Sequence, residues 1–287
     1  MRVAILGFGL IGGSLARALA EAPDRDAWSV AAWSPTGNGP RRAAADGVIA
    51  QATSAPAEAL DGAHLVVLAA PPTGTLTLIE RFAEGLGGAL EPGAVITDVA
   101  STKGAIVAAA TERGLRFVGG HPMAGRETSG YGAAAADLFR GQPWVVVPTD
   151  PDDAAAIVAV ETLAVATGAR PVRMDAAEHD TAVAAISQLP MVVAAALVET
   201  VAGADDWTAT RTLAASGWRD TTRLARGDVA MGAGIAATNA PAIAARLHRF
   251  RTVIDGWLAD LEQPGGPDEA ALADRLTAAR DRLGDAS

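Results

Sequence analysis

The stretch Gly7-Phe8-Gly9-Leu10-Ile11-Gly12 directly follows the apolar run Val3 to Leu6 and opens a segment rich in Ala and Leu. Its G-x-G-x-x-G spacing is typical of a tight turn in which the backbone approaches a pyrophosphate and a helix packs closely on a strand. The N-terminus of that helix then faces the phosphates. Because strand, turn and helix agree, the stretch predicts a dinucleotide site. Within it we assign to the cofactor Gly7, Gly9, Leu10, Ile11 and Gly12.

Up to about residue 174, short apolar runs bounded by Gly, Pro or Asp alternate with Ala-rich helical stretches. This alternation predicts buried parallel strands in a Rossmann-type, doubly wound α/β sheet. The expected strands are Val3 to Leu6, Val30 to Trp33, Leu65 to Ala69, Val95 to Val99, Phe117 to Val118 and Val145 to Val147. We therefore expect a dinucleotide-binding domain over residues 1–174.

From residue 175 to 287 the pattern is helical throughout, which predicts an all-helical substrate and dimerisation domain. The expected helices are Asp180 to Ala202, Trp207 to Ala225, Val229 to Ala237, Pro241 to Glu262, and a last one that carries Leu272, Leu276 and Leu283. Asn239 is placed to cap the fourth helix, whose apolar residues recur every three or four positions from Ile243 to Leu261. That stripe and the uncharged segment Thr181 to Val198 predict a homodimer.

Composition excludes several classes of protein. The 287 residues hold 23 Lys and Arg against 33 Asp and Glu, a formal net charge of −10, which disfavours nucleic acid and anionic membrane surfaces as partners. There is no cysteine, so disulfides, thiolate zinc sites and Cys nucleophiles are excluded. The first residues read as folded protein rather than a leader, and we expect a cytoplasmic enzyme. Ser187, Gln188 and Pro190 interrupt the uncharged segment, which favours a helix buried in the protein over a membrane span.

Cofactor choice depends on the end of the second expected strand, about 20 residues past the glycine motif, where NAD-binding proteins place an Asp or Glu. Ser34 stands there, followed by Thr36, Arg41 and Arg42. Hydroxyl and guanidinium groups suit a 2′-phosphate, so NADP is modestly favoured over NAD, with Ser34 and Arg41 as contacts. Alternatively the two Arg form a solvated face and NAD binds without the acid. Pro71, just past a strand, is also assigned to the cofactor.

Two further motifs fall where strands end, at the sheet edge that binds ligands in open α/β folds. Asp98-Val99-Ala100-Ser101-Thr102-Lys103 joins a strand to a helix, and on its own Ser101 or Thr102 reads equally as a helix cap. Gly119-Gly120-His121-Pro122-Met123 places His121 in a glycine-rich loop. With an ordinary pKa of about 6.5, His121 can take a proton at neutral pH. His179 lies close enough to the expected domain junction to be a second candidate.

Together these motifs give the chain a close resemblance to the prephenate and arogenate dehydrogenases of tyrosine biosynthesis. The matching stretches are GFGLIGGSLARAL (7–19), TDVASTK (97–103), GGHPMAGRETSG (119–130), EHD (178–180), ISQLP (186–190) and GWRDTTRLARGD (217–228). The resemblance implies oxidative decarboxylation of a cyclohexadienyl substrate, a nicotinamide cofactor and a helical dimer domain. It makes His121 the base, Ser101 a group that orients the ring hydroxyl, and Arg223 the partner of a substrate carboxylate. Glu127 and Asp220 would border the substrate.

The chain departs from this family in one helix, which usually reads SHLPH and here reads Ser187-Gln188-Leu189-Pro190-Met191. Gln188 still donates hydrogen bonds but carries no charge, and Met191 donates none. We assign Gln188 to the substrate and leave its identity open among prephenate, arogenate and an amino-substituted prephenate analogue. The other readings are a two-domain hydroxyacid or imine reductase, which does not explain the HPMAG loop, and a nicotinamide sensor without turnover.

Overall fold

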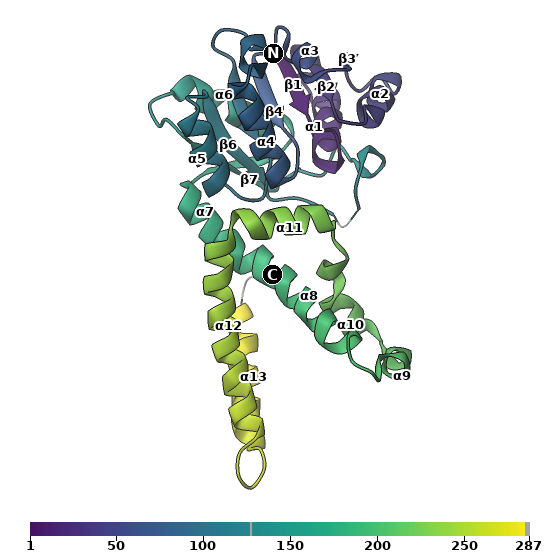
Figure 1. Ribbon diagram of the computed structural model, residues 1–287, viewed down its shortest axis with the longest axis vertical. Helices are drawn as coiled ribbons and strands as arrows, with labels where there is room; N and C mark the ends of the chain where they lie inside the picture. Colours follow the sequence, from purple (N-terminus) through teal and green to yellow (C-terminus); the bar gives the residue numbers. More distant parts are fainter. Residues whose placement is uncertain (127, 285–287) are drawn as a thin grey trace. The chain divides into compact units, whose positions relative to one another are not determined.

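Apolar runs within the described residues, 1–126 and 128–284, form one eight-stranded sheet with helices on both faces (Figure 1). In the computed structural model the strands lie in the order β3-β2-β1-β4-β5-β6-β7-β8. Their bounds are β1 Arg2–Leu6, β2 Ser29–Trp33, β3 Gln51–Ala52, β4 Leu65–Leu68, β5 Val95–Asp98, β6 Phe117–Pro122, β7 Pro143–Pro148 and β8 Arg170–Arg173. All six predicted strands occur, and the short edge strands β3 and β8 are additional.

One pair of strands corrects the all-parallel prediction. β7 runs antiparallel to β6, with Gly120 opposite Val146, whereas every other neighbouring pair is parallel. A parallel pair needs a long crossover, usually a helix. Between β6 and β7 the described chain has only the 3₁₀ turn η3 (Tyr131–Ala133), so the strand returns alongside its predecessor.

The helices and turns complete the described chain. They are α1 Leu10–Glu21, η1 Arg25–Ala27, α2 Asn38–Ala45, α3 Pro56–Leu60, α4 Pro72–Ala83, η2 Leu86–Ala89, α5 Gly104–Glu112, α6 Ala154–Ala166, α7 Ala176–Val183, η4 Ala184–Gln188, α8 Leu189–Ala202, α9 Trp207–Thr210, η5 Arg211–Leu213, α10 Ser216–Thr221, η6 Arg223–Arg226, α11 Val229–Thr238, α12 Ala240–Leu261 and α13 Glu269–Leu283. The chain divides into two compact units, Met1–Ala240 and Pro241–Ser287.

Alternate residues of each strand feed two separate apolar cores, as the two-residue repeat of a strand requires. On β1, Val3 and Ile5 join the core that packs against α1, α2 and α6, while Ala4 and Leu6 join the core against α3, α4 and α5. Both sheet faces are therefore covered, which explains why the central strands carry apolar residues on both faces. The edge left open for a ligand is the one where the strands end.

The long helix Ala176–Ala202 contains a π-helical turn, η4, immediately before Pro190. Pro190 has no N–H to bond to the carbonyl of Ile186, so the regular ladder is interrupted at this point. The helix is long and apolar enough to cross a membrane by length and composition alone, which is weak support for a span. Only 22% of the most apolar window of this helix is buried, and Ile186 is 70% exposed. The helix is therefore less buried than the sequence predicted.

The predicted helix from Trp207 to Ala225 is wrong as a single element. It breaks into α9, η5, α10 and η6, with extended backbone at Ala214 and Ala215. Threonine hydroxyls in this stretch bond to nearby carbonyls, as Thr212 Oγ1 does to Ala209 at 2.7 Å, and such local bonds compete with a regular helix.

The unit Pro241–Ser287 holds most of α12 together with α13. Arg275 of α13 joins the two helices: its guanidinium pairs with Asp260, donates to the Val253 carbonyl at 3.1 Å and lies 4.6 Å from the centroid of the Trp257 ring. Asp268 caps α13 by accepting from the N–H groups of Ala270 and Ala271.

Candidate active site

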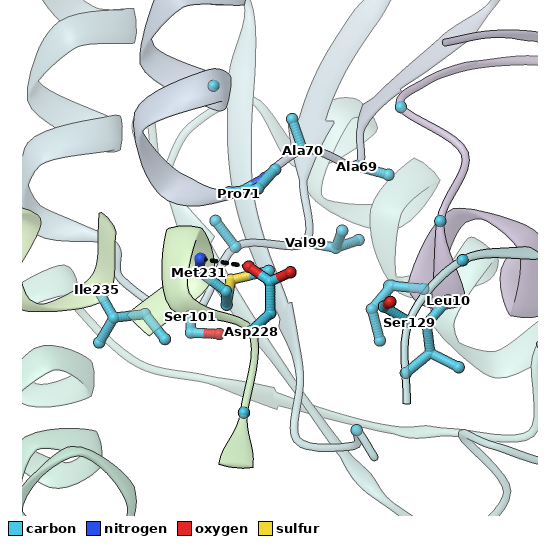
Figure 2. A pocket seen from close by; sticks show the side chains of 18 of the residues that line it. Leu10, Ala69, Ala70, Pro71, Val99, Ser101, Ser129, Asp228, Met231 and Ile235 are labelled. Atoms are coloured by element: carbon cyan, nitrogen blue, oxygen red, sulfur yellow. Dashed lines mark hydrogen bonds between the residues drawn. The ribbon is translucent and has the colours of Figure 1, made fainter. Parts of the chain in front are cut away.

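A cavity of about 1480 Å³ lies at the carboxyl ends of the central strands, within the unit Met1–Ala240. Its walls come from the glycine motif, the segments after β4, β5 and β6, and helices α8 and α11. Figure 2 shows side chains from these elements: Ser101 lies with Met231 and Ile235 of α11 on one side, Leu10 lies on the other, and Val99 lies between them. A cavity with these walls can hold a nucleotide cofactor at the glycine motif and a second reactant beside it.

The glycine motif has the geometry that a dinucleotide needs. Gly7 has φ +101°, and a Cβ there would collide with the Ala69 carbonyl; a Cβ at Gly12 would lie 2.5 Å from the Gly7 oxygen. A Cβ at Gly9 would meet nothing within 4 Å, so open space faces the N-terminus of α1. No side chain caps that helix among the described residues, which leaves its first N–H groups available to phosphate oxygens.

Most residues predicted to bind the cofactor line this cavity. They are Gly7, Gly9, Leu10, Ile11, Ser34 and Pro71. Gly12 instead packs between helix and strand, and of the two adjacent arginines it is Arg42 that lines the cavity. Arg41 is tied to its own turn, donating to the Thr36 carbonyl at 3.1 Å and to Asn38 Oδ1 at 2.7 Å.

Ser101 follows the end of β5, whereas His121 lies within β6, opposite Val145 of β7, and not in a loop as the sequence predicted. A buried ion pair holds the two segments together. Asp98 accepts from the N–H groups of Ala100 (2.9 Å) and Gly120 (3.1 Å) and pairs with Lys103. Both side chains of the pair are completely buried. Burial lowers the pKa of Lys103, and the charge of Asp98 opposes that shift. The pair therefore fixes the ends of β5 and β6, and with them the two predicted catalytic residues.

His121 is buried, lines the cavity and is linked to a second histidine. Its Nδ1 lies 2.8 Å from Nε2 of His179, whose Nδ1 lies 2.8 Å from Oδ1 of Asp180. Burial, the neighbouring His179 and the charge of Lys103 hold the pKa of His121 well below its ordinary value. His121 is therefore neutral at pH 7, the state that a base requires.

Gln188 lines the cavity but is also part of a buried amide network. Its Nε2 donates to the Ser101 carbonyl at 3.2 Å, and its Oε1 accepts from Asn239 Nδ2 at 2.7 Å. The same Asn239 nitrogen donates to the Asp180 carbonyl at 2.9 Å. The Asn239 side chain, predicted to cap α12, thus joins Gln188 to the helix that carries His179.

The other residues predicted to bind substrate are not among the residues seen to line the cavity. Among the cavity's described lining residues, Arg223 and Asp220 do not occur, although Leu224 and Ala225 next to them do. Glu127 lies outside the described residues. The cavity adds Arg126 and also Asp228, which caps α11 by accepting from Met231 N at 2.8 Å (Figure 2).

The sequence reasoning missed the pairing of His179 with His121. The two residues are 58 positions apart, so no spacing rule joins them. The available signal was an adjacent His and Asp at a helix start, within a motif whose role the sequence does not assign.

Comparison with known proteins gives matches along most of the chain. The family model for "Prephenate dehydrogenase, nucleotide-binding domain" matches residues 34–173, and that for "Prephenate dehydrogenase, dimerization domain" matches residues 175–264. A prephenate dehydrogenase of Bacillus subtilis is 31% identical over 265 residues, which cover 91% of this chain and 68% of the relative.

Solved structures agree with these matches. An arogenate dehydrogenase from Synechocystis is 30% identical with a TM-score of 0.78, over 99% of this chain and 100% of that one. A prephenate dehydrogenase from Aquifex aeolicus, solved with hydroxyphenyl propionate and NAD⁺, has a TM-score of 0.89 at 24% identity, over 100% of this chain and 98% of that one. At that identity the likeness concerns the fold, and it confirms the predicted fold class.

Proposed function

The chain belongs to the prephenate dehydrogenase family, and we propose that it catalyses the NAD(P)-dependent oxidative decarboxylation of prephenate or arogenate at the cavity described above. The observation that carries this proposal is the position of His121. It is a buried, neutral histidine that lines the same cavity as Gly7 and Gly9, with only Nε2 left free of the His179 contact. A nicotinamide sensor without turnover would have no use for such a base.

The roles of the chain's own residues follow from this arrangement. The ring hydroxyl of the substrate donates to Nε2 of His121, and the Ser101 hydroxyl orients it. A nicotinamide cofactor held by the glycine motif at Gly7 and Gly9 would supply the acceptor for the hydride from ring carbon C4. As that hydride leaves, the hydroxyl proton passes to His121. The bond to the ring carboxylate breaks, its electron pair enters the ring and CO₂ departs. His121 then returns the proton to the oxygen, which leaves a phenol.

For the substrate carboxylates we propose Arg223, and from the sequence we propose that Asp220 and Glu127 border the substrate. Support comes from the segment 217–228, which contains both Asp220 and Arg223, and from Leu224 and Ala225 of η6, which line the cavity. Charge-assisted pairing to a guanidinium suits a carboxylate that must be held while the adjacent bond breaks. Arg126 also lines the cavity and is a further cation there.

Gln188 acts on the substrate side mainly through Ser101, because both ends of its amide already have partners. Around it the helical wall is apolar, with Met191, Val192, Ala195, Met231 and Ile235. This wall suits the face of a cyclohexadienyl ring. An amino-substituted prephenate analogue stays an alternative substrate for the same cavity.

For the cofactor we propose NADP over NAD. Ser34 accepts from Gly37 N at 3.2 Å and lines the cavity without a carboxylate beside it, and Arg42 supplies a guanidinium there. A hydroxyl and a cation favour a 2′-phosphate, which an Asp would repel. Arg41, the arginine assigned from sequence, supports the turn instead.

We also propose a homodimer formed through residues 175–287. The match to a dimerisation domain supports it, as does the exposed apolar surface of the helix Ala176–Ala202, where Ile186 is 70% exposed.

The test is an assay of the purified protein with prephenate, arogenate and an amino-substituted prephenate analogue, each with NAD⁺ and NADP⁺, following cofactor reduction and CO₂ release. We expect turnover with at least one pair. His121→Asn should lower it by a factor of about 10² to 10⁴, the usual contribution of a positioned acid–base group, with cofactor affinity unchanged. No turnover in any arm, with cofactor binding intact, would refute the proposal.

A further inference from the structure

We infer that His179 and Asp180 are positioning residues for His121: they hold it in the tautomer that is protonated on Nδ1, so that Nε2 faces the cavity as a bare acceptor. The inference rests on the proposed function, in which His121 is the base. It concerns residues that touch the base and not the substrate.

The direction of the hydrogen bonds follows from Asp180. Its Oδ1 accepts from Lys103 N at 2.7 Å and its Oδ2 from Gly104 N at 2.8 Å, so both oxygens of the carboxylate accept hydrogen bonds. Burial works to raise the pKa of Asp180, but hydrogen bonds from His179 and from these two N–H groups hold it below its usual value. An ionised carboxylate only accepts, so the 2.8 Å contact requires a proton on Nδ1 of His179.

The proton positions on the other ring nitrogens then follow. A neutral His179 with its proton on Nδ1 has a bare Nε2, which can only accept. The 2.8 Å contact to His121 Nδ1 therefore needs the proton on the His121 side. One proton per ring leaves Nε2 of His121 unprotonated.

The surroundings disfavour a positive charge on His121. His121 is faced by His179 from α7 and by Lys103 from the segment before α5, and Lys103 is itself neutralised by Asp98 of β5. A positive charge on either ring would add to that of Lys103 in a buried site. Within residues 1–126 and 128–284, the carboxylate that contacts the histidine pair is that of Asp180, which lies beside His179 and reaches His121 through it.

This arrangement serves the proton transfer in both directions. While His121 holds the substrate proton it is an imidazolium, and its Nδ1–H bond to His179 spreads the charge toward the carboxylate of Asp180. The ring stays in place because Nδ1 is bonded throughout. The same ring orientation then returns the proton to the product oxygen.

The direct test is ¹⁵N NMR of the histidine side chains in the cofactor-bound protein, which reports the protonated nitrogen of each ring. The chain has four histidines, so His→Gln variants assign the signals. We expect His121 and His179 both protonated on Nδ1 and bare on Nε2. A proton on Nε2 of His121 would overturn the inference. This readout needs no turnover, so it stands apart from failure of the proposed function.

Two variants test the consequence for activity. His179→Phe keeps a ring of similar size without nitrogens, and we expect kcat to fall at least tenfold with little change in cofactor affinity, while the ¹⁵N spectrum shows His121 losing its single tautomer. His179→Gln offers an oxygen to His121 Nδ1 and should recover part of kcat and the tautomer. His248→Phe makes the same exchange at an exposed histidine and should change neither. An unchanged His121 tautomer in His179→Phe would contradict the inference, whatever happens to stability.

Discussion

At the residue scale, the buried state of His121 determines how the reaction responds to pH. Burial and the neighbours His179 and Lys103 lower its pKa, so the ring takes up a proton only below its ordinary value of about 6.5. The base is lost when pH falls through this depressed pKa. We therefore expect kcat/KM to be flat down to about pH 6.5 and to decline only below it. A profile with an acid limb above pH 7 that tracks His121 would contradict this.

The role of Arg223 in substrate binding is a proposal, because Arg223 is not among the described residues that line the cavity. If it pairs with a substrate carboxylate, Arg223→Ala should raise the KM for the substrate by about 10- to 100-fold, since a charge-assisted bond contributes about 1.5 to 3 kcal/mol. Cofactor affinity should stay constant. Arg219→Ala, at an exposed position on α10, is the matched control. An unchanged substrate KM would make Arg223 a structural residue.

Ser34 and the two arginines after it decide cofactor preference. Ser34→Asp should shift the ratio of NADP to NAD affinity by about tenfold, or about 1.4 kcal/mol, toward NAD. Ser34→Ala separates the new charge from loss of the hydroxyl. Arg42→Ala should weaken NADP alone, whereas Arg41→Ala should leave the ratio unchanged, because the Arg41 guanidinium is held by its own turn. Titration of both cofactors against each variant measures these ratios.

At the element scale, contact between α1 and β1 depends on Gly12. A Cβ there would lie 2.5 Å from the Gly7 oxygen and 3.2 Å from the Ala69 side chain. Gly12→Ala should therefore lower the free energy of unfolding by about 1 to 3 kcal/mol, the usual effect of overpacking, and weaken cofactor binding. Gly88→Ala, where a Cβ meets nothing within 4 Å, is the control. Chemical denaturation of both variants provides the comparison; equal stability would mean that α1 can shift at no cost.

Sequence patterns predicted elements well where burial imposes a period and poorly where it does not. Strands β1, β2, β4 and β5 are buried on both faces, so their apolar runs were clear. β8 lies at a sheet edge and reads Arg-Pro-Val-Arg, with an exposed arginine at each end and two partly buried residues between them, so it gave no such run. In the site, His121 and Ser101 were found because strand ends meet at one edge. The contact between His121 and His179 depends on how α7 packs beside α5, which no local pattern encodes.

At the scale of the whole molecule, the helix Ala176–Ala202 contributes both to the proposed active site and to the surface of the proposed dimer. One part of its surface carries His179, Asp180 and Gln188 into buried networks, while Ile186 is 70% exposed. An apolar helix that is exposed to this extent favours a protein partner. Because residues 175–264 match a dimerisation domain, the partner that we propose is a second copy of this chain.

We therefore expect light scattering to report a dimer at micromolar concentration. Ile186→Glu places a charge on the exposed apolar surface and should shift the protein toward monomer, because burying an unpaired carboxylate in an interface is costly. Val165→Glu makes the same change at a side chain 60% exposed on α6 and should leave the dimer intact. A wild-type monomer at this concentration would refute the dimer. If both variants stay dimeric, the interface lies elsewhere, and the exposed surface around Ile186 must face solvent or another partner. Cofactor titration of Ile186→Glu then shows whether cofactor affinity depends on assembly. We expect the affinity to be unchanged, because the sheet that carries the glycine motif has its own apolar core on each face.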